Sequence, residues 1–112
     1  MRLEEVAHLV GAKVLTGEEL MDADIDSAFA SDMMSDVLAY AEDQALLLTG
    51  LNNPQAVRTA LMLDMSCILF VRGKEPAEEV VSLANLSHIA VLSTALTMYE
   101  ASGRLYAAGL HR

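Results

Sequence analysis

Three apolar runs constrain the fold of this chain more than any other feature. Residues 45–49, 67–71 and 89–93 recur at about 22-residue intervals, and small or polar residues follow each run. None of the runs shows the apolar–polar alternation of a strand with one face in water. Continuous apolar strands are typical of parallel sheets, because helical crossovers bury both faces. We therefore predict an α/β fold, a three-layer sandwich with a mainly parallel sheet of four to five strands joined by right-handed crossovers.

Local capping patterns predict where the later helices begin. Proline is well tolerated at the first position of a helix, and a T-x-x-E sequence forms a capping box. We predict helices opened by Asn53/Pro54, by Glu75/Pro76 and by Thr97, which end near Asp64, Leu86 and Gly109, respectively.

The first part of the chain is less regular, but it supplies two more strands. We predict a helix over residues 2–10, strands over 13–16 and 28–30, and an irregular loop over 18–26. A further helix follows residue 30, with Ser31 or Asp32 as its N-cap. With 112 residues, the chain fits a single domain, residues 1–112.

Composition limits the classes of function. The chain is 54% hydrophobic with a net charge of -9, and its first 43 residues hold eleven acidic but only two basic residues. Nucleic-acid binding normally needs a basic surface, so we expect no nucleic-acid partner. No apolar run approaches the roughly 18 residues of a membrane span, and the N-terminus lacks a basic signal region. We expect no membrane association and a cytoplasmic location. Cys67, the single cysteine, is expected to be a buried thiol.

Polar and small residues gather where the predicted strands end. In an open parallel sheet, ligands bind beyond the carboxyl ends of the strands, and free amides at helix N-termini favour anions. Turn formation and helix capping would explain the same residues without a ligand. The candidate ligand-binding residues are Ser31, Asp32, Thr49, Gly50, Asn52, Arg72, Gly73, Ser93, Thr94 and Thr97.

Familiar catalytic and cofactor motifs are absent from the sequence. It contains no G-x-x-x-x-G-K-[ST] loop, no G-x-G-x-x-G, no G-x-S-x-G and no H-E-x-x-H. The three histidines lack the spacing of metal ligands. Asp32 and Asp36 would share a helix face, but a solvated first turn explains that pair equally well. We therefore expect no cofactor, no metal and no catalytic residue.

Four segments together resemble the DRTGG domain family: ASDMMSDVLAY (30–40), LLLTGLNNP (46–54), ILFVRGKEP (68–76) and VLSTALTMYEASGRL (91–105). The last two also resemble the N-terminal domain of bacterial HPr kinase/phosphorylase. The resemblance implies a MurF/HPr-kinase N-domain-like α/β fold and an accessory role in association rather than catalysis. The string that names the family is absent, and Thr49-Gly50 is its nearest remnant. Small free-standing members resemble bacterial accessory proteins.

Three functions remain open at this point. The first is a non-catalytic regulatory module, a homodimer that engages a partner protein and senses a small anionic ligand such as a nucleotide. The broad apolar arc of residues 77–86 favours a dimer interface. The second is a small enzyme acting on a phosphorylated or carboxylated metabolite, with Asp32 as base and Arg72 as anion clamp. The third is a purely structural dimerisation domain.

Overall fold

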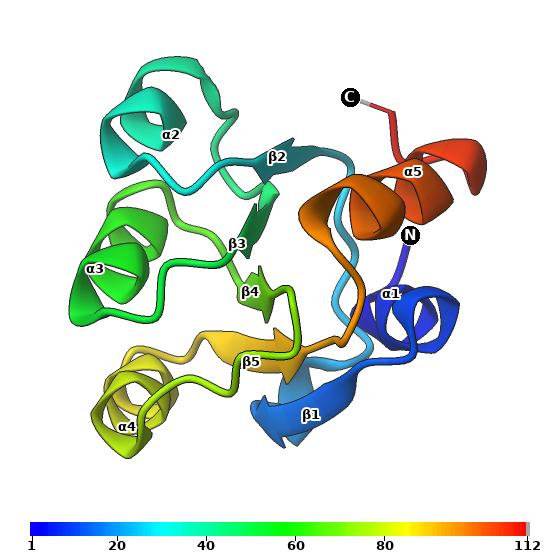
Figure 1. The fold of residues 1–112 in the computed structure, drawn as a ribbon. Coiled ribbons are helices and arrows are strands. Elements are labelled where there is room, and N and C mark those ends of the chain that lie inside the picture. The colour runs from blue at the N-terminus through cyan, green and yellow to red at the C-terminus, as the bar shows by residue number, and fades with distance from the viewer. Residues whose placement is uncertain (112) are drawn as a thin grey trace.

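The computed structural model describes residues 1–111, and in it a five-stranded sheet is covered by helices on both faces (Figure 1). The elements in chain order are α1 (Leu3–Val10), β1 (Lys13–Thr16), the short 3-10 helix η1 (Glu18–Leu20), β2 (Ala28–Ala30), α2 (Met34–Tyr40), β3 (Leu46–Thr49), α3 (Pro54–Met62), β4 (Cys67–Phe70), α4 (Glu78–Leu86), β5 (Ala90–Ser93) and α5 (Met98–Ala107).

The sheet is mostly parallel, as the apolar runs predict. Its strand order is β1-β5-β4-β3-β2. Strands β2 to β5 pair in parallel with their neighbours, whereas β1 pairs antiparallel with β5. The predicted α/β fold and its mainly parallel sheet are therefore confirmed. The four parallel strands follow one another in sequence order, so their carboxyl ends meet at a single edge.

Two apolar clusters fill the space on either side of the sheet. Helices α2, α3 and α4 cover one face, and α1 and α5 cover the other (Figure 1). Successive residues of each central strand alternate between the two clusters. Leu46 and Leu48 pack on the side of α1 and α5, whereas Leu47 packs on the opposite side. Because both faces are covered, every residue of β3, β4 and β5 is buried, which explains why these strands lack alternation.

Two predicted helix starts are wrong, and polar contacts in the preceding loops explain both. Met33, not Ser31 or Asp32, is the N-cap of α2, and the Ser31 hydroxyl accepts the Met33 N–H (3.0 Å) in the turn that precedes the helix. Helix α4 begins at Glu78 rather than at Glu75/Pro76. The loop ahead of α4 is held by a contact between the side chains of Glu75 and Lys13.

Cys67 and the loop over residues 18–26 can also be compared with their predictions. Cys67 is a buried thiol in β4, as expected, and burial raises its pKa. The loop over residues 18–26 contains the single turn η1. Across residues 1–111, no helix is both long enough and apolar enough to cross a lipid bilayer.

Candidate functional site

The loops that follow the four parallel strands converge on one edge of the sheet, here called the carboxyl edge. It consists of residues 31–32, 49–53, 72–74 and 93–97, which follow or end β2, β3, β4 and β5. All ten candidate residues therefore lie along this edge. They do not form one cluster, however, because hydrogen bonds divide them into smaller groups with different roles.

Asp32 is the centre of the largest group. The Gly50 N–H donates to Asp32 Oδ1 (2.7 Å), and the Thr49 hydroxyl lies 3.3 Å from the same oxygen. Arg72 Nη2 donates to Asp32 Oδ2 (3.1 Å). One carboxylate thus connects the loops after β2, β3 and β4, and both of its oxygens are engaged.

These contacts determine the charge state of Asp32. The Gly50 N–H holds the pKa of the Asp32 carboxyl below its ordinary value of 3.8, and Arg72 and Thr49 act in the same direction against the opposing effect of partial burial. Asp32 is therefore ionised at neutral pH, with both oxygens already accepting hydrogen bonds. A carboxylate in this state supports a structural or charge-balancing role better than that of a general base.

The guanidinium of Arg72 lies directly against Gly50. A Cβ at position 50 would come within 1.9 Å of Arg72 Nη2, so the glycine leaves the space that the guanidinium occupies. Arg72 has a left-handed backbone (φ 68°), which is uncommon for a residue with a side chain. Its side chain keeps 38% of its surface exposed. The loops therefore fix Arg72 at the edge while leaving part of its donor surface open to solvent.

The loops after β4 and β5 are bonded to each other. Because α4 and α5 lie on opposite faces of the sheet, these loops diverge, and a crevice between diverging loops is the usual ligand site of an open sheet. Here the Arg72 N–H donates to the Leu96 carbonyl (2.7 Å) and the Gly73 N–H donates to the Thr94 carbonyl (2.9 Å). The backbone itself closes the position where a crevice would form.

Thr94 is a structural residue in this arrangement. Its side chain is buried, its hydroxyl donates to the Val10 carbonyl (2.6 Å), and the same oxygen accepts the Leu96 N–H (3.2 Å). The bond to Val10 satisfies an acceptor at the C-terminal end of α1. Thr94 therefore ties α1 to the carboxyl edge and has no free group for a ligand.

Three other candidates also serve local structure. Asn52 Oδ1 accepts the N–H of Ala77, the N-cap of α4 (2.8 Å). Thr97 caps α5 by accepting the Glu100 N–H (3.2 Å), which agrees with the capping box in the sequence. Ser93 is the buried last residue of β5, and it pairs with Lys13 of β1 and Phe70 of β4 in the sheet. Arg72 is the one cationic residue among the ten candidates, and its side chain is partly exposed.

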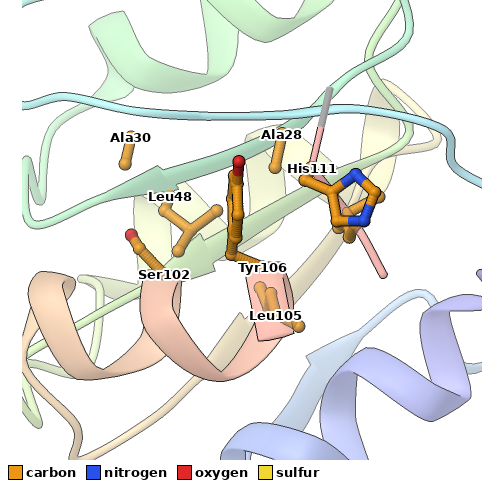
Figure 2. Close-up of a pocket in the computed structure, with 8 residues that line it drawn as sticks. Ala28, Ala30, Leu48, Ser102, Leu105, Tyr106 and His111 are labelled. Carbon is orange, nitrogen blue, oxygen red and sulfur yellow. The ribbon is translucent and has the colours of Figure 1, made fainter. Parts of the chain in front are cut away.

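Three hollows of the described chain lie elsewhere, along residues 24–30. The first has a volume of about 300 Å³ and is lined by Ala28, Ala30, Leu48, Ser102, Leu105, Tyr106, Leu110 and His111 (Figure 2). The second, about 280 Å³, is lined by Met1, Glu5, Ile25, Asp26, Ala108, Gly109 and Leu110. The third, about 210 Å³, is lined by Asp24, Ile25, Asp26, Ser27, Glu42, Asp43 and Gln44.

Sequence reasoning missed these hollows. The signal available was weak: Asp22, Asp24 and Asp26 alternate with smaller or apolar residues, and two alanines flank the only large residue of β2. Period-two alternation indicates an extended segment with two different sides. Among residues 1–111, no group of three or more His, Cys, Asp and Glu side chains could hold a metal ion.

Comparison with known proteins gives the family directly. The family model of the DRTGG domain matches residues 5–108. The chain belongs to the DRTGG domain family. This result confirms the resemblance found in the sequence. The comparison with curated proteins found no significant match.

A solved structure shares the fold of this DRTGG domain. It contains the CBS and DRTGG domains of the regulatory region of Clostridium perfringens pyrophosphatase, complexed with the activator diadenosine tetraphosphate. The TM-score is 0.74 at 16% identity, and the match covers 93% of this chain. The match covers 45% of the solved chain, so the similarity concerns one part of a longer chain.

Proposed function

We propose that this DRTGG domain is a non-catalytic regulatory module that binds a small anionic ligand, such as a nucleotide, and engages a partner protein as a homodimer. Two findings support a regulatory role. The chain belongs to a family whose member in the Clostridium perfringens pyrophosphatase lies in a regulatory region, and that region was solved with a nucleotide activator.

Arg72 is the single observation that carries the ligand part of the proposal. Its guanidinium is held at the carboxyl edge by Asp32 and lies over the bare backbone of Gly50. Arginine presents five N–H donors in a planar fork that suits phosphate and carboxylate groups. Because only Nη2 bonds to Asp32 and part of the side chain is exposed, an anion can approach the remaining donors.

The same geometry favours binding over catalysis. The enzyme alternative requires Asp32 as a base, but its oxygens accept hydrogen bonds from Gly50, Thr49 and Arg72, and its pKa is lowered. A low pKa weakens a general base, since the best catalytic pKa lies near the working pH. We therefore assign Asp32 the role of orienting Arg72.

The C-terminal ends of α3 and α4 support the homodimer. Leu61 and Met62 end α3 with 55% and 69% of their surfaces exposed, and Leu86 ends α4 with 78% exposed. The two helices contact each other in the fold. Large exposed apolar residues on neighbouring elements are typical of interaction surfaces. A Leu86→Asp variant is expected to be monomeric in analytical ultracentrifugation, whereas Glu79→Gln, on the same helix, keeps the mass of the parent protein.

A ligand screen tests the proposal. Isothermal titration and thermal unfolding with diadenosine tetraphosphate, ATP and inorganic phosphate should detect binding of at least one anion, and adenosine should not bind. At a ligand concentration of 100 times Kd, the stabilisation expected is about 2.7 kcal/mol. Arg72→Ala should abolish the effect, and Arg58→Ala, an exposed arginine on α3, should retain it. Binding that survives in Arg72→Ala would contradict this site.

A further inference from the structure

The outer edge of β2 is open in this fold. β2 is the last strand of the sheet, and within residues 1–111 only β3 pairs with it. The Ser31 N–H donates to the Leu48 carbonyl (3.0 Å), and the Leu46 N–H donates to the Ser27 carbonyl (2.9 Å). Along a parallel strand, alternate residues direct their backbone groups to the same side. Ala28 and Ala30 therefore direct their N–H and carbonyl groups away from β3.

The three hollows adjoin one another along residues 24–30. The first and second share Leu110, and the second and third share Ile25 and Asp26. Together they flank the extended segment 24–30 and form what we call the β2 groove. Its β2 end is mainly apolar, whereas its far end is lined by Glu5, Asp24 and Asp26 and by other acidic residues. The groove thus changes from an apolar end beside the outer edge of β2 to an acidic end beside residues 24–26, where the backbone of Ile25 is bonded to Met1.

Helix α5 supplies the opposite wall of the apolar end. Figure 2 shows Tyr106 projecting from α5 next to Leu48. Ala28 and Ala30 of β2 line the same hollow. The Tyr106 side chain is 64% exposed, and its ring lies 5.2 Å from that of His111. Tyrosine contributes strongly at interfaces because a large rigid ring ends in a polar group. The apolar end therefore offers a side-chain pocket next to the backbone groups of Ala28 and Ala30 that point away from β3.

The charge around the groove decides what kind of occupant fits. Residues 14–57 contain nine acidic residues and neither lysine nor arginine, and the N-terminal ammonium of Met1, 3.6 Å from Asp24 Oδ1, offsets only part of this charge. A second copy of this chain would bring the same acidic segment against itself, and like charges in contact oppose association. A basic segment would be attracted instead, because its cations would lie against the acidic end of the groove. Charge complementarity thus favours a different molecule with lysine or arginine side chains.

We infer that the β2 groove binds an extended basic segment of a partner protein, which adds a strand to the outer edge of β2. The partner backbone pairs with Ala28 and Ala30, an apolar side chain enters the pocket beside Tyr106, and lysine or arginine side chains reach Asp24 and Asp26. Strand addition of this kind takes affinity from backbone hydrogen bonds and specificity from alternate side chains. The inference rests on the partner-protein part of the proposed function and is independent of the anion site.

Selection from a random peptide library displayed on phage tests this inference. The full chain is used as bait, and the selected peptide is then synthesised and titrated by fluorescence anisotropy. We expect peptides that combine lysine or arginine with alternating apolar residues. Ala30→Pro removes one outward N–H and should weaken binding at least about tenfold, while Tyr106→Ala should weaken it to a similar extent. Asp24→Asn with Asp26→Asn should weaken binding and reduce its salt dependence.

Matched controls make the result specific. Tyr99→Ala changes an exposed tyrosine on the same helix outside the groove, and Glu18→Gln with Glu19→Gln removes the same charge elsewhere; both should bind like the parent protein. Selected peptides without a basic bias, or equal binding by Ala30→Pro and Tyr106→Ala, would overturn the inference. A dimer that Ala30→Pro dissociates would also overturn it, because a second copy would then occupy the edge. Anion binding through Arg72 is measured separately. If the parent protein bound no anion, that result would contradict the proposed function but not this inference.

Discussion

The carboxyl edge and the outer edge of β2 both present polar backbone to solvent, but they differ in whether that backbone is already paired. At the carboxyl edge, Asp32, Thr94 and the amides of Arg72 and Gly73 are bonded to neighbouring loops. At β2, alternate residues face outward with no neighbouring strand in the described sheet. A residue that follows a parallel strand is therefore not automatically available to a ligand, since hydrogen bonds between neighbouring loops can already occupy its polar groups.

A large loss of stability should come from a substitution on the inner side of β2, and a matched substitution on its outer side should cost less. Ser31→Pro removes the donor to the Leu48 carbonyl and leaves a buried acceptor unpaired, so we expect a loss of about 2 kcal/mol in the free energy of unfolding. Ala30→Pro, one residue earlier, removes an outward N–H and should cost much less. Ser31→Ala isolates the contribution of the hydroxyl. Urea unfolding of the three variants measures the difference, and equal losses in both proline variants would contradict an open outer edge.

A substitution of Thr94 tests the hydrogen bonding at the carboxyl edge. Thr94→Val keeps the shape of the side chain but leaves the buried Val10 carbonyl without its donor, so a loss of about 2 kcal/mol is expected. Thr97→Val is the matched control, because it removes an exposed helix cap worth about 1 kcal/mol. Chemical denaturation of both variants gives the comparison. If Thr94→Val were the milder change, the tie between α1 and this edge would not contribute as described.

A smaller effect, sensitive to pH, should appear at Asp32. Because the folded-state pKa of Asp32 lies below its ordinary value of 3.8, its stabilising contribution is complete above that value and is lost as the pH falls through the folded-state pKa. Asp32→Asn should therefore cost about 1 kcal/mol at pH 7, and the difference from the parent protein should shrink in acid. Asp22→Asn, at an exposed position, serves as the control. A difference that stays constant down to the acid limit would contradict the ion pair.

Most of the fold could be predicted from the sequence because burial on both faces leaves a clear pattern. The runs that became β3, β4 and β5, and the caps at Asn53 and Thr97, are local signals with direct physical causes. The starts of α2 and α4 could not be predicted, since they depend on contacts of Ser31, Asn52 and Glu75 that form only in the folded loops.

The candidate site was harder to predict than the fold. Sequence reasoning located the edge on which all ten candidate residues lie, because the carboxyl ends of parallel strands must meet. It could not foresee that Thr94 bonds to Val10, which lies far away in sequence. The β2 groove was missed because β2 is only three residues long and its walls come from α5 and the segment before it. Such a surface depends on tertiary packing, which leaves little local pattern.

Amide hydrogen exchange of single residues tests the central contrast most directly. The account predicts that the amides of Ala28 and Ala30 exchange quickly in the free protein, whereas those of Ser31 and Gly73 are protected. Addition of a basic peptide from the library selection should protect Ala28 and Ala30 without changing Gly73. Protection of Ala28 and Ala30 already in the free protein would show that the outer edge of β2 is paired, and this result would contradict the account.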